Sequence, residues 1–557
     1  MTSPTIELNA ATTARAALTA LDGHERLTFE ADGHMLAVTR GDIARMTAMG
    51  LGDLPIDAIG APVDYPGLPD PQAAPLQTLD ISRRLTTYFP AYVAAALYEM
   101  QSLLRKGELR AYVIGGNIRD LLLYNARLLD IQDVDLTIEG SAIGASQFIV
   151  AHSRNFSVEA CYPDFGTVTL LYKQALRFDL ASTRVERYAA CGALPEVIQR
   201  GAPLAQDIIR RDFTVNTLAM AVHELGVIED RVGGMDDIAA RLIRALHPLS
   251  FFEDPSRILR AFKFLTRLDF QLAPGTERLL RQFLKYGDRA YHGGGERIKH
   301  ELRKFCEAEE TPVKRRWMGY FRERGCARLA NMTAPDPMAL DPADAEAAGA
   351  HARDAMACYW RHYPLLREAL GETSLGPDFR WRLFLCFIFG GASGSDLAQT
   401  AHRLGLTRVE REQIVHYRQL LDLGGLDRIQ ESSSPYEVYT AFHDRPLSAA
   451  VAAAAVYYDD RPARMKTVLL ALRAYRDKYA GQRPELNGDD LLDLGVPPGE
   501  AIGETLRDLL KLKLMGRLKD RLSEIRHVRQ RLGLLSNEPD PGPAPPNERD
   551  DPEDDDA

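Results

Sequence analysis

The chain has 557 residues, of which 45% are hydrophobic and 26% are charged, and its formal net charge is −10. These values are typical of a globular protein with about three or four domains. No apolar run reaches membrane-spanning length, and the first residues lack the basic and apolar segments of a signal peptide. We therefore expect a cytoplasmic protein with no membrane attachment.

Residues 26–43 contain an Asp32-Gly33 pair between two stretches of alternating apolar residues, followed by a helix start. An Asp-Gly pair in this setting predicts a β-hairpin. The segment resembles part of a CBS motif, of which only one partial copy is evident. It could be a vestigial element, a docking element or a dimerisation surface, so a homodimer is one expectation. Residues 1–75 would comprise this segment and a proline-rich linker from 61 to 75.

The next informative stretch is residues 111–127. Ala111 to Ile114 form a short apolar run typical of a strand, a Gly115-Gly116 pair follows, and residues 117–127 carry Leu and Ile at helical spacing. A glycine turn that leads into a helix brings backbone N–H groups and a partial positive charge close to a bound phosphate. The pattern predicts a cradle for a triphosphate.

A pair of aspartates follows at Asp133 and Asp135. On a strand spanning residues 133–139 both side chains point the same way, because strand residues two apart share a face. Two carboxylates on one face can hold Mg²⁺, although the same pattern alone is often a solvated face. Asp179, on an expected strand over 178–186, is a candidate third carboxylate, and a solvated strand residue is the alternative.

Two further motifs lie downstream. Residues 207–216 hold paired arginines, Arg210 and Arg211, and an asparagine, Asn216. Arginine offers fixed forks of donors to phosphate oxygens, and Asn offers a donor and an acceptor to sugar hydroxyls. The alternative is a basic helix start capped by Asp. Residues 253–260 then place Asp254 and Arg257 at a spacing that shares one helix face, so the pair could act as a unit or form an ordinary helical salt bridge.

In this order the motifs resemble the head of the DNA polymerase beta superfamily, and more closely the class II tRNA nucleotidyltransferase and bacterial poly(A) polymerase family. The resemblance implies that Asp133 and Asp135 bind Mg²⁺, with Asp179 as a third catalytic carboxylate. It also implies a protein template in which Asp254 and Arg257 read the Watson–Crick edge of the incoming base. The nucleotide-binding residues that it implies are Gly115, Gly116, Arg119, Asp120, Arg210, Arg211, Asp212, Asn216, Glu253, Asp254, Arg257 and Arg260.

The fold implied is α+β: a polymerase-beta-type nucleotidyltransferase head with a mixed sheet and helices, followed by an all-α neck, body and tail. We expect the head at 76–245, a nucleotide-binding neck at 246–310, an RNA-binding helical body and tail at 311–535, and a disordered acidic tail at 536–557. That last segment holds nine acidic residues and only Arg549, so without it the net charge is about −2. Residues 295–302 resemble a helix that braces the base-reading element, and 185–206 stand where the family has a flexible loop.

The activity implied is addition of CCA, or of its terminal A, to the tRNA 3′ end from CTP and ATP by two-metal nucleotidyl transfer. A poly(A) polymerase shares these motifs and is the alternative. From another class, the chain could be a catalytically idle RNA-binding or nucleotide-binding protein. Basic clusters at 314–316 and 511–529 could contact a phosphate backbone, although charged helix faces are usually only solvated.

Overall fold

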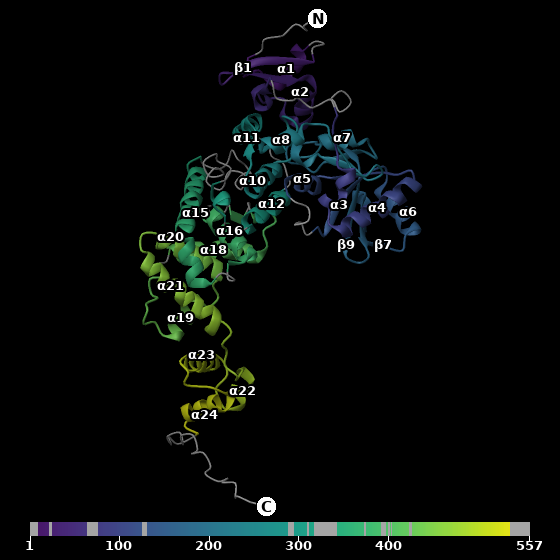
Figure 1. Cartoon of the computed structure of the whole chain (residues 1–557). Coiled ribbons are helices and arrows are strands. Elements are labelled where there is room, and N and C mark those ends of the chain that lie inside the picture. Colours follow the sequence, from purple (N-terminus) through teal and green to yellow (C-terminus); the bar gives the residue numbers. More distant parts are fainter. Residues whose placement is uncertain are drawn as a thin grey trace, which may run out of the picture. The chain divides into compact units, whose positions relative to one another are not determined.

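The computed structural model forms two compact units, and each is described by itself. The first comprises Met1–Trp360 and Gly376–Ile414, and the second comprises Arg361–Leu375 and Val415–Ala557 (Figure 1). The residues described are 9–21, 25–63, 76–124, 131–287, 295–308, 311–316, 342–371, 375–391, 397–398, 401–402, 404–422 and 426–534. The expected acidic tail and most of the expected linker at 61–75 lie outside them.

An N-terminal module, residues 9–63, begins the first unit. The hairpin predicted from Asp32-Gly33 is confirmed, because both residues have positive φ, 54° and 74°, and β1 pairs with β2 from Arg26↔Thr39 to Ala31↔His34. The resemblance to a CBS motif stays a prediction. The elements of the module are α1 (Ala14–Ala20), β1 (Arg26–Ala31), β2 (His34–Thr39), α2 (Arg40–Met46), η1 (Thr47–Leu51), η2 (Ile56–Ile59) and β3 (Ala61–Pro62).

A mixed eight-stranded sheet forms the head, as predicted, with the order β4-β13-β12-β5-β6-β9-β8-β7. Its strand pairs are antiparallel except β6–β9, which is parallel. The edge strand β4 therefore pairs with β13, from the far end of the head sequence. The strands are β4 (Gln77–Asp80), β5 (Arg110–Ile114), β6 (Asp133–Glu139), β7 (Phe156–Tyr162), β8 (Thr167–Tyr172), β9 (Leu176–Ser182), β12 (Ala219–Ala221) and β13 (Val227–Asp230).

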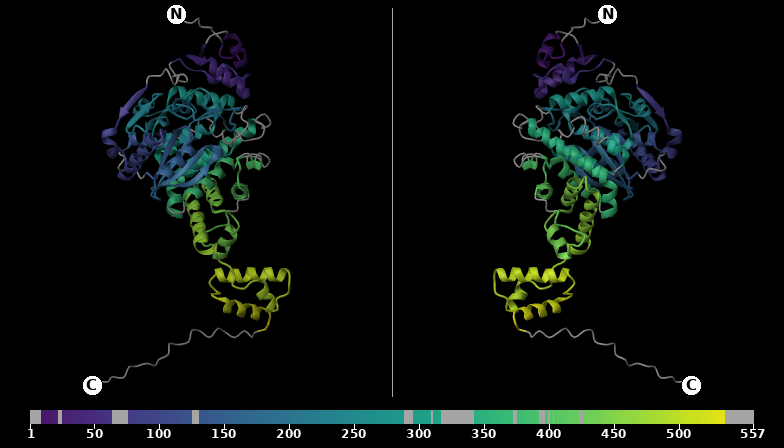
Figure 2. Two further views of the ribbon diagram at one scale, coloured as in Figure 1. Left: turned by 90° about the vertical axis from the view of Figure 1, so that its right-hand side faces the viewer. Right: turned by 90° about the vertical axis from the view of Figure 1, so that its left-hand side faces the viewer.

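The main core of the head lies on one face of this sheet. The apolar residues of α4 and α6 pack there against Val134, Leu136 and Ile138 of β6. Figure 2 draws the ribbon from two further sides. On the other face, α7 covers only β5 and β12, so the neighbouring part of β6 is left open. The head helices are η3 (Ser82–Arg84), α3 (Leu85–Tyr88), α4 (Ala91–Lys106), α5 (Gly116–Leu123), α6 (Ala142–His152), η5 (Pro163–Phe165), α7 (Leu204–Ile209), η6 (Thr214–Asn216) and α8 (Gly234–Ala240).

The connector between head and neck is organised by Asp230. Its buried carboxylate accepts hydrogen bonds from the backbone N–H groups of residues 232–235, at 2.7 to 3.1 Å, and so fixes the start of α8. The neck then folds as α9 (Ser250–Glu253), α10 (Ser256–Leu268), α11 (Pro274–Tyr286) and α12 (Gly295–Glu307), with a short parallel pair of β14 (Leu242–Ile243) and β15 (Gln271–Leu272).

Beyond Leu272 the described residues contain helices and no strands, which confirms the all-α remainder. No described helix is both long and apolar enough to cross a membrane. In the last part of the second unit a small core forms around Leu491, Leu509 and Val528, and buried Glu524 accepts hydrogen bonds from the backbone N–H groups of residues 485 and 486. The helices are α15 (Pro342–Leu370), α16 (Pro377–Phe389), α18 (Arg408–Asp422), α19 (Pro435–Phe442), α20 (Leu447–Tyr457), α21 (Pro462–Ala474), η9 (Tyr475–Tyr479), α22 (Gly488–Asp493), α23 (Glu500–Leu514) and α24 (Arg521–Arg531).

Candidate active site

The two predicted carboxylates lie on β6, on the face opposite the main core. Val134 and Leu136 are buried in that core, so Asp133 and Asp135 point to the open face. Asn117 of α5 fixes this strand, since its side chain donates to the backbone carbonyl of Asp133 at 3.1 Å and accepts from the N–H of Asp135 at 3.2 Å. The glycine turn and the carboxylate strand are therefore joined directly.

Asp179 lies on β9, in register beside Asp135. Its Oδ1 accepts a hydrogen bond of 2.6 Å from the Thr169 hydroxyl, which orients the carboxylate. Desolvation raises the pKa of Asp135, and the charges of Asp179 and Asp133 add to this, while Arg211 opposes it. Negative charge is thus concentrated where β6 and β9 meet.

This donor set fits Mg²⁺ in part. In the described residues no group of three or more His, Cys, Asp or Glu side chains could hold a metal ion by itself. Mg²⁺ usually keeps several waters and is bound by one or two carboxylates together with substrate phosphates. Asp133 and Asp135 would hold it in that way, and the cation would offset the repulsion of Asp135 by Asp179 and Asp133, which adds to the effect of burial on the pKa of Asp135.

The glycine turn has the geometry expected of a cradle. Gly115 has φ 81° and ψ −129°, a conformation that strongly favours glycine, and α5 begins at the next residue. The helix ends at Leu123, whereas the prediction ran to residue 127; residues 125–130 lie outside the described residues. A phosphate-binding role for the first turn of α5 stays a prediction.

Arg119, from the same helix, is almost completely buried. Its guanidinium donates to Asp120 at 2.8 Å and to the Asn216 side chain at 2.5 Å, and it lies over the Phe264 ring at 4.9 Å. Asp120 also accepts from Arg267 at 2.7 Å. Arg119 and Asp120 thus tie the cradle to the second motif and to α10, while a phosphate-binding role for Arg119 stays a prediction.

The paired arginines are held by one buried carboxylate, Asp207, whose role the sequence analysis did not assign. Asp207 accepts from Arg210 at 2.9 Å and from Arg211 at 2.9 Å, and their charges lower its pKa although burial acts to raise it. Arg211 also donates to Thr137 of β6 at 3.1 Å. Both guanidinium groups are therefore positioned before any substrate binds.

Asp212 and Asn216 form a second bridge. Asp212 accepts from Asn216 at 3.0 Å and from Arg260 of α10 at 2.6 Å. The Asn216 side chain therefore has one donor and its acceptor engaged within the protein, at Asp212 and Arg119. These contacts couple the second motif to the neck helix.

The prediction that Asp254 and Arg257 lie on one helix is wrong. Asp254 is extended, with φ −140° and ψ 93°, and α10 begins only at Ser256. Pro255 explains this break, because proline disfavours the helical conformation of the residue before it. Asp254 instead accepts from Arg297 of α12 at 3.0 Å, and Arg257 donates to the Ser250 hydroxyl at 2.9 Å and to the Arg210 carbonyl at 2.6 Å.

Glu253 is buried beneath this element. Its carboxylate lies 3.2 Å from His247 Nε2, 3.3 Å from Arg45 and 3.9 Å from Arg257. Burial acts to raise its pKa, but these neighbours outweigh it and lower the pKa to about 2. Burial lowers the pKa of His247, so the imidazole is neutral near pH 7.

Residues 185–206, expected at the place of a flexible loop, contain most of a β-hairpin, β10 (Arg184–Arg187) with β11 (Glu196–Arg200), and the start of α7. Arg297 holds the connection between these strands by donating to the carbonyls of Gly192 and Ala193 at 3.0 and 2.9 Å. α12 packs against α10, as predicted for a bracing helix. α12 also contacts Asp254, through Arg297.

These elements enclose a cleft of about 1260 Å³. Asp133, Asp120 and Glu253 are not part of its lining. Residues that the sequence analysis did not assign also line it, among them Thr169, Tyr188, Phe264 and Arg297. The predicted residues that line it are Gly115, Gly116, Arg119, Asp135, Asp179, Arg210, Arg211, Asp212, Asn216, Asp254, Arg257 and Arg260.

Comparison with known proteins finds similarity in sequence, strongest in the head. Residues 111–244 match the poly A polymerase head domain. An A-adding tRNA nucleotidyltransferase of Geobacter sulfurreducens is 29% identical over 461 residues, which cover 81% of this chain and 48% of that protein. The A-adding tRNA nucleotidyltransferase of Aquifex aeolicus is 42% identical over 181 residues, covering 32% of this chain and 21% of that protein. The chain thus spans about half or less of the length of these relatives.

Solved structures show the same fold. An apo CCA-adding enzyme aligns with a TM-score of 0.62 at 24% identity, covering 82% of this chain and 99% of the other. The Thermotoga maritima CCA-adding enzyme complexed with tRNA aligns with a TM-score of 0.55 at 24% identity and the same coverage, 82% and 99%. At this identity the likeness establishes the fold alone, a mixed-sheet head followed by a helical continuation.

Proposed function

We propose that this chain, a member of the class II tRNA nucleotidyltransferase and poly(A) polymerase family through its head domain, adds CCA or its terminal A to tRNA 3′ ends. The observation that carries the proposal is the pairing of Asp135 with Asp179 in one cleft with Arg211 and the Asp254–Arg257 element. The relatives named A-adding tRNA nucleotidyltransferases support addition of the terminal A in particular.

In the proposed reaction the 3′-hydroxyl of the RNA attacks the α-phosphate of the nucleotide, and pyrophosphate leaves. Asp133 and Asp135 would hold Mg²⁺, which when bound favours ionisation of the hydroxyl and neutralises charge on the leaving pyrophosphate. Arg210 and Arg211, fixed by Asp207, would bind the triphosphate, and Asp179 would complete the set of carboxylates. No nucleophilic side chain is needed.

Base selection would rest on Asp254 and Arg257. An ionised Asp only accepts hydrogen bonds and Arg only donates them, so together they can complement the mixed Watson–Crick edge of C or A. Both line the cleft, and contacts with Arg297, Ser250 and Arg210 hold them in place. The exposed rings of Tyr162 and Phe165, also in the lining, suit stacking against bases of the primer end.

The proposed partners are ATP, CTP and the tRNA 3′ end, and the proposed location is the cytoplasm. A homodimer through the N-terminal module stays a prediction.

A primer-extension assay tests the function. It uses the full chain, Mg²⁺ and tRNA transcripts that end before CCA, after C or after CC, each supplied with CTP, ATP or both. ATP use restricted to the CC-ended transcript identifies an A-adding enzyme, and addition of all three nucleotides identifies a complete CCA enzyme. Long A tails would instead favour a poly(A) polymerase, which the match of residues 111–244 makes the second candidate. Binding of tRNA without any incorporation would contradict both.

A further inference from the structure

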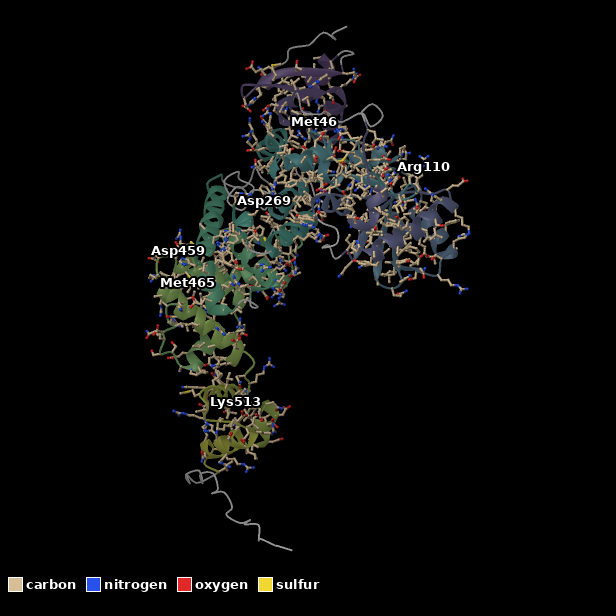
Figure 3. All side chains as sticks on the ribbon, in the orientation of Figure 1. Met46, Arg110, Asp269, Asp459, Met465 and Lys513 are labelled. Atoms are coloured by element: carbon tan, nitrogen blue, oxygen red, sulfur yellow. The ribbon has the colours of Figure 1, made fainter. Side chains whose placement is uncertain are left out.

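The N-terminal module is docked on the neck through two arginines. One is Arg278 of α11, which is almost completely buried and forms ion pairs with Asp32, at 3.1 Å, and with Asp57. α11 also packs against η2 and β3 of the module. Figure 3 shows labelled Met46, the last residue of α2, on the side of the module toward the neck.

The second contact leads to the base-reading element. Arg45 of α2 lies 3.3 Å from Glu253 and 3.4 Å from Nδ1 of His247. Asp42, held by the Thr39 hydroxyl at 2.7 Å, forms an ion pair with Arg45 at 3.0 Å. Arg45 is thus oriented from within the module before it reaches the neck.

On the opposite side of Glu253 and His247 lies Arg257. The Arg257 guanidinium is 3.9 Å from the Glu253 carboxylate and 3.4 Å from Nε2 of His247. Two arginines therefore bracket one buried Glu–His pair, and only Arg257 lines the cleft. Glu253 attracts both guanidinium groups. The presence of Arg45 therefore limits how strongly Glu253 draws the Arg257 side chain away from the cleft.

We infer that Arg45 is a positioning residue for nucleotide selection, acting on Arg257 through Glu253 and His247. The inference rests on the proposed function, since it assigns a role toward the same nucleotide site. It gives the N-terminal module a function in this chain: the module contributes a cation to the support of the protein template. Arg45 touches no substrate, so its effect is expected on binding and discrimination of the nucleotide.

The test compares Arg45→Met, Arg45→Lys and wild type in the full chain. We expect Arg45→Met to raise Kd and KM for the preferred nucleotide about tenfold, the scale of one charge-assisted contact, and to increase incorporation of the wrong nucleotide. The kcat and the KM for tRNA should change little, a split that general destabilisation would not produce. Arg45→Lys keeps the charge and should restore most of the affinity.

Arg15→Met is the matched control. Arg15 belongs to the same module and pairs with Asp53 on its exposed surface, at 3.4 Å, so its loss should leave Kd, KM and fidelity as in wild type. Arg278→Met, which weakens docking, should change nucleotide selection in the same direction as Arg45→Met.

Three results have distinct meanings. Folded Arg45→Met with wild-type Kd, KM and fidelity would overturn the inference. If Arg45→Met fails to fold, wild-type Kd and fidelity in folded Arg278→Met would overturn the inference equally. Wild type that binds ATP or CTP but adds nothing to any RNA would overturn the proposed function, and the inference would then be decided by the Kd values alone.

Discussion

At the scale of single residues, most of the residues predicted from the sequence line the cleft, but the sequence did not show which contacts hold them in place. The chemistry of the motifs favoured roles for Asp135 and Arg211, whereas the role of Arg257 was an expectation from the family resemblance. The sequence analysis did not assign Asp207, because a carboxylate three and four residues before two arginines is equally typical of an ordinary helical ion pair. Only the burial of Asp207 shows that it orients both arginines.

Substitution of Asp133 and Asp135 tests whether both carboxylates hold Mg²⁺. Asp135 lines the cleft beside Asp179, whereas Asp133 lies outside the lining, 3.6 Å from Arg177. If both hold Mg²⁺, Asp135→Asn and Asp133→Asn should each lower kcat by about a thousandfold or more, because Lewis-acid stabilisation is worth several kcal/mol. The measurement is single-turnover incorporation at saturating Mg²⁺, with thermal melting as the check on folding.

Glu159→Gln is the control for this pair, since Glu159 also binds Arg177, at 3.1 Å, but lies on β7. It should retain wild-type turnover. Full activity of Asp133→Asn would remove Asp133 from the set of ligands.

Gly234 gives a prediction about stability. A Cβ at this position would lie 2.5 Å from the carbonyl oxygen of Thr214, so the backbone of the second motif would have to move. We expect Gly234→Ala to lower the free energy of unfolding of the head by about 1–3 kcal/mol, as overpacking does. Urea unfolding measures this, with Gly503→Ala as control, because a Cβ there meets nothing within 4 Å. A neutral Gly234→Ala would contradict the close packing of the connector.

At the scale of secondary-structure elements, the errors of the sequence analysis have a common cause. The strand expected over 178–186 is divided at Thr183 between β9 and β10, which belong to different sheets. Periodicity predicted the strand at 133–139 and the start of the helix after Gly115, because local patterns set these elements. It placed Asp254 on the helix of Arg257 because their spacing fits a helix, yet Pro255 ends that continuity. The partners of both residues, Arg297 and Ser250, come from other elements, and tertiary contacts of this kind leave no local pattern.

The Glu253–His247 pair predicts how the neck responds to acid. The pKa of Glu253 in the folded protein is about 2, against a usual 4.5, so its contribution to stability is complete above pH 4.5 and is lost as the pH falls toward 2. That contribution is on the order of 3 kcal/mol. The pKa of His247 is also lowered in the folded protein, and its imidazole is neutral there. His247 therefore also makes the protein less stable as the pH falls below the usual imidazole pKa of 6.5.

Urea unfolding at pH 7, 5 and 3 can separate this effect from that of other carboxylates. Glu253→Gln should show a smaller loss of stability between pH 5 and pH 3 than wild type, since it has no carboxylate to protonate at that position. Equal losses of stability in the variant and in wild type would show that the pKa of Glu253 is not lowered in the folded protein.

At the scale of the whole molecule, the sequence predicted the α+β class, the order of head and helical continuation, and the N-terminal hairpin. It did not predict that the hairpin module would reach Glu253, because Arg45 is separated from its partner by the entire head sequence. The sequence also did not predict the parallel pairing of β6 with β9, which brings Asp179 to Asp135. Contacts between distant segments had to come from the structure.

The predicted contact of residues 511–529 with RNA can be tested by salt dependence. Arg517, Lys519 and Arg529 are exposed in the second unit. Replacing all three by Glu should weaken tRNA binding and make the dependence of log K on log salt less steep by about three, one for each lost phosphate contact. Filter binding across a salt series measures the slope. Lys106→Glu, on α4 of the head, is the control, and an unchanged slope in the triple variant would place the RNA elsewhere.

The order of strands in the head sheet has a consequence for how the protein is made. β4 is the first head strand to leave the ribosome, yet its partner β13 is the last, so the edge of the sheet stays open until residue 230 has been synthesised. Pairing of such distant segments slows folding. A nascent chain that already displays Asp133 and Asp135 therefore lacks a finished sheet, and the proposed site is complete only when synthesis has passed the whole head.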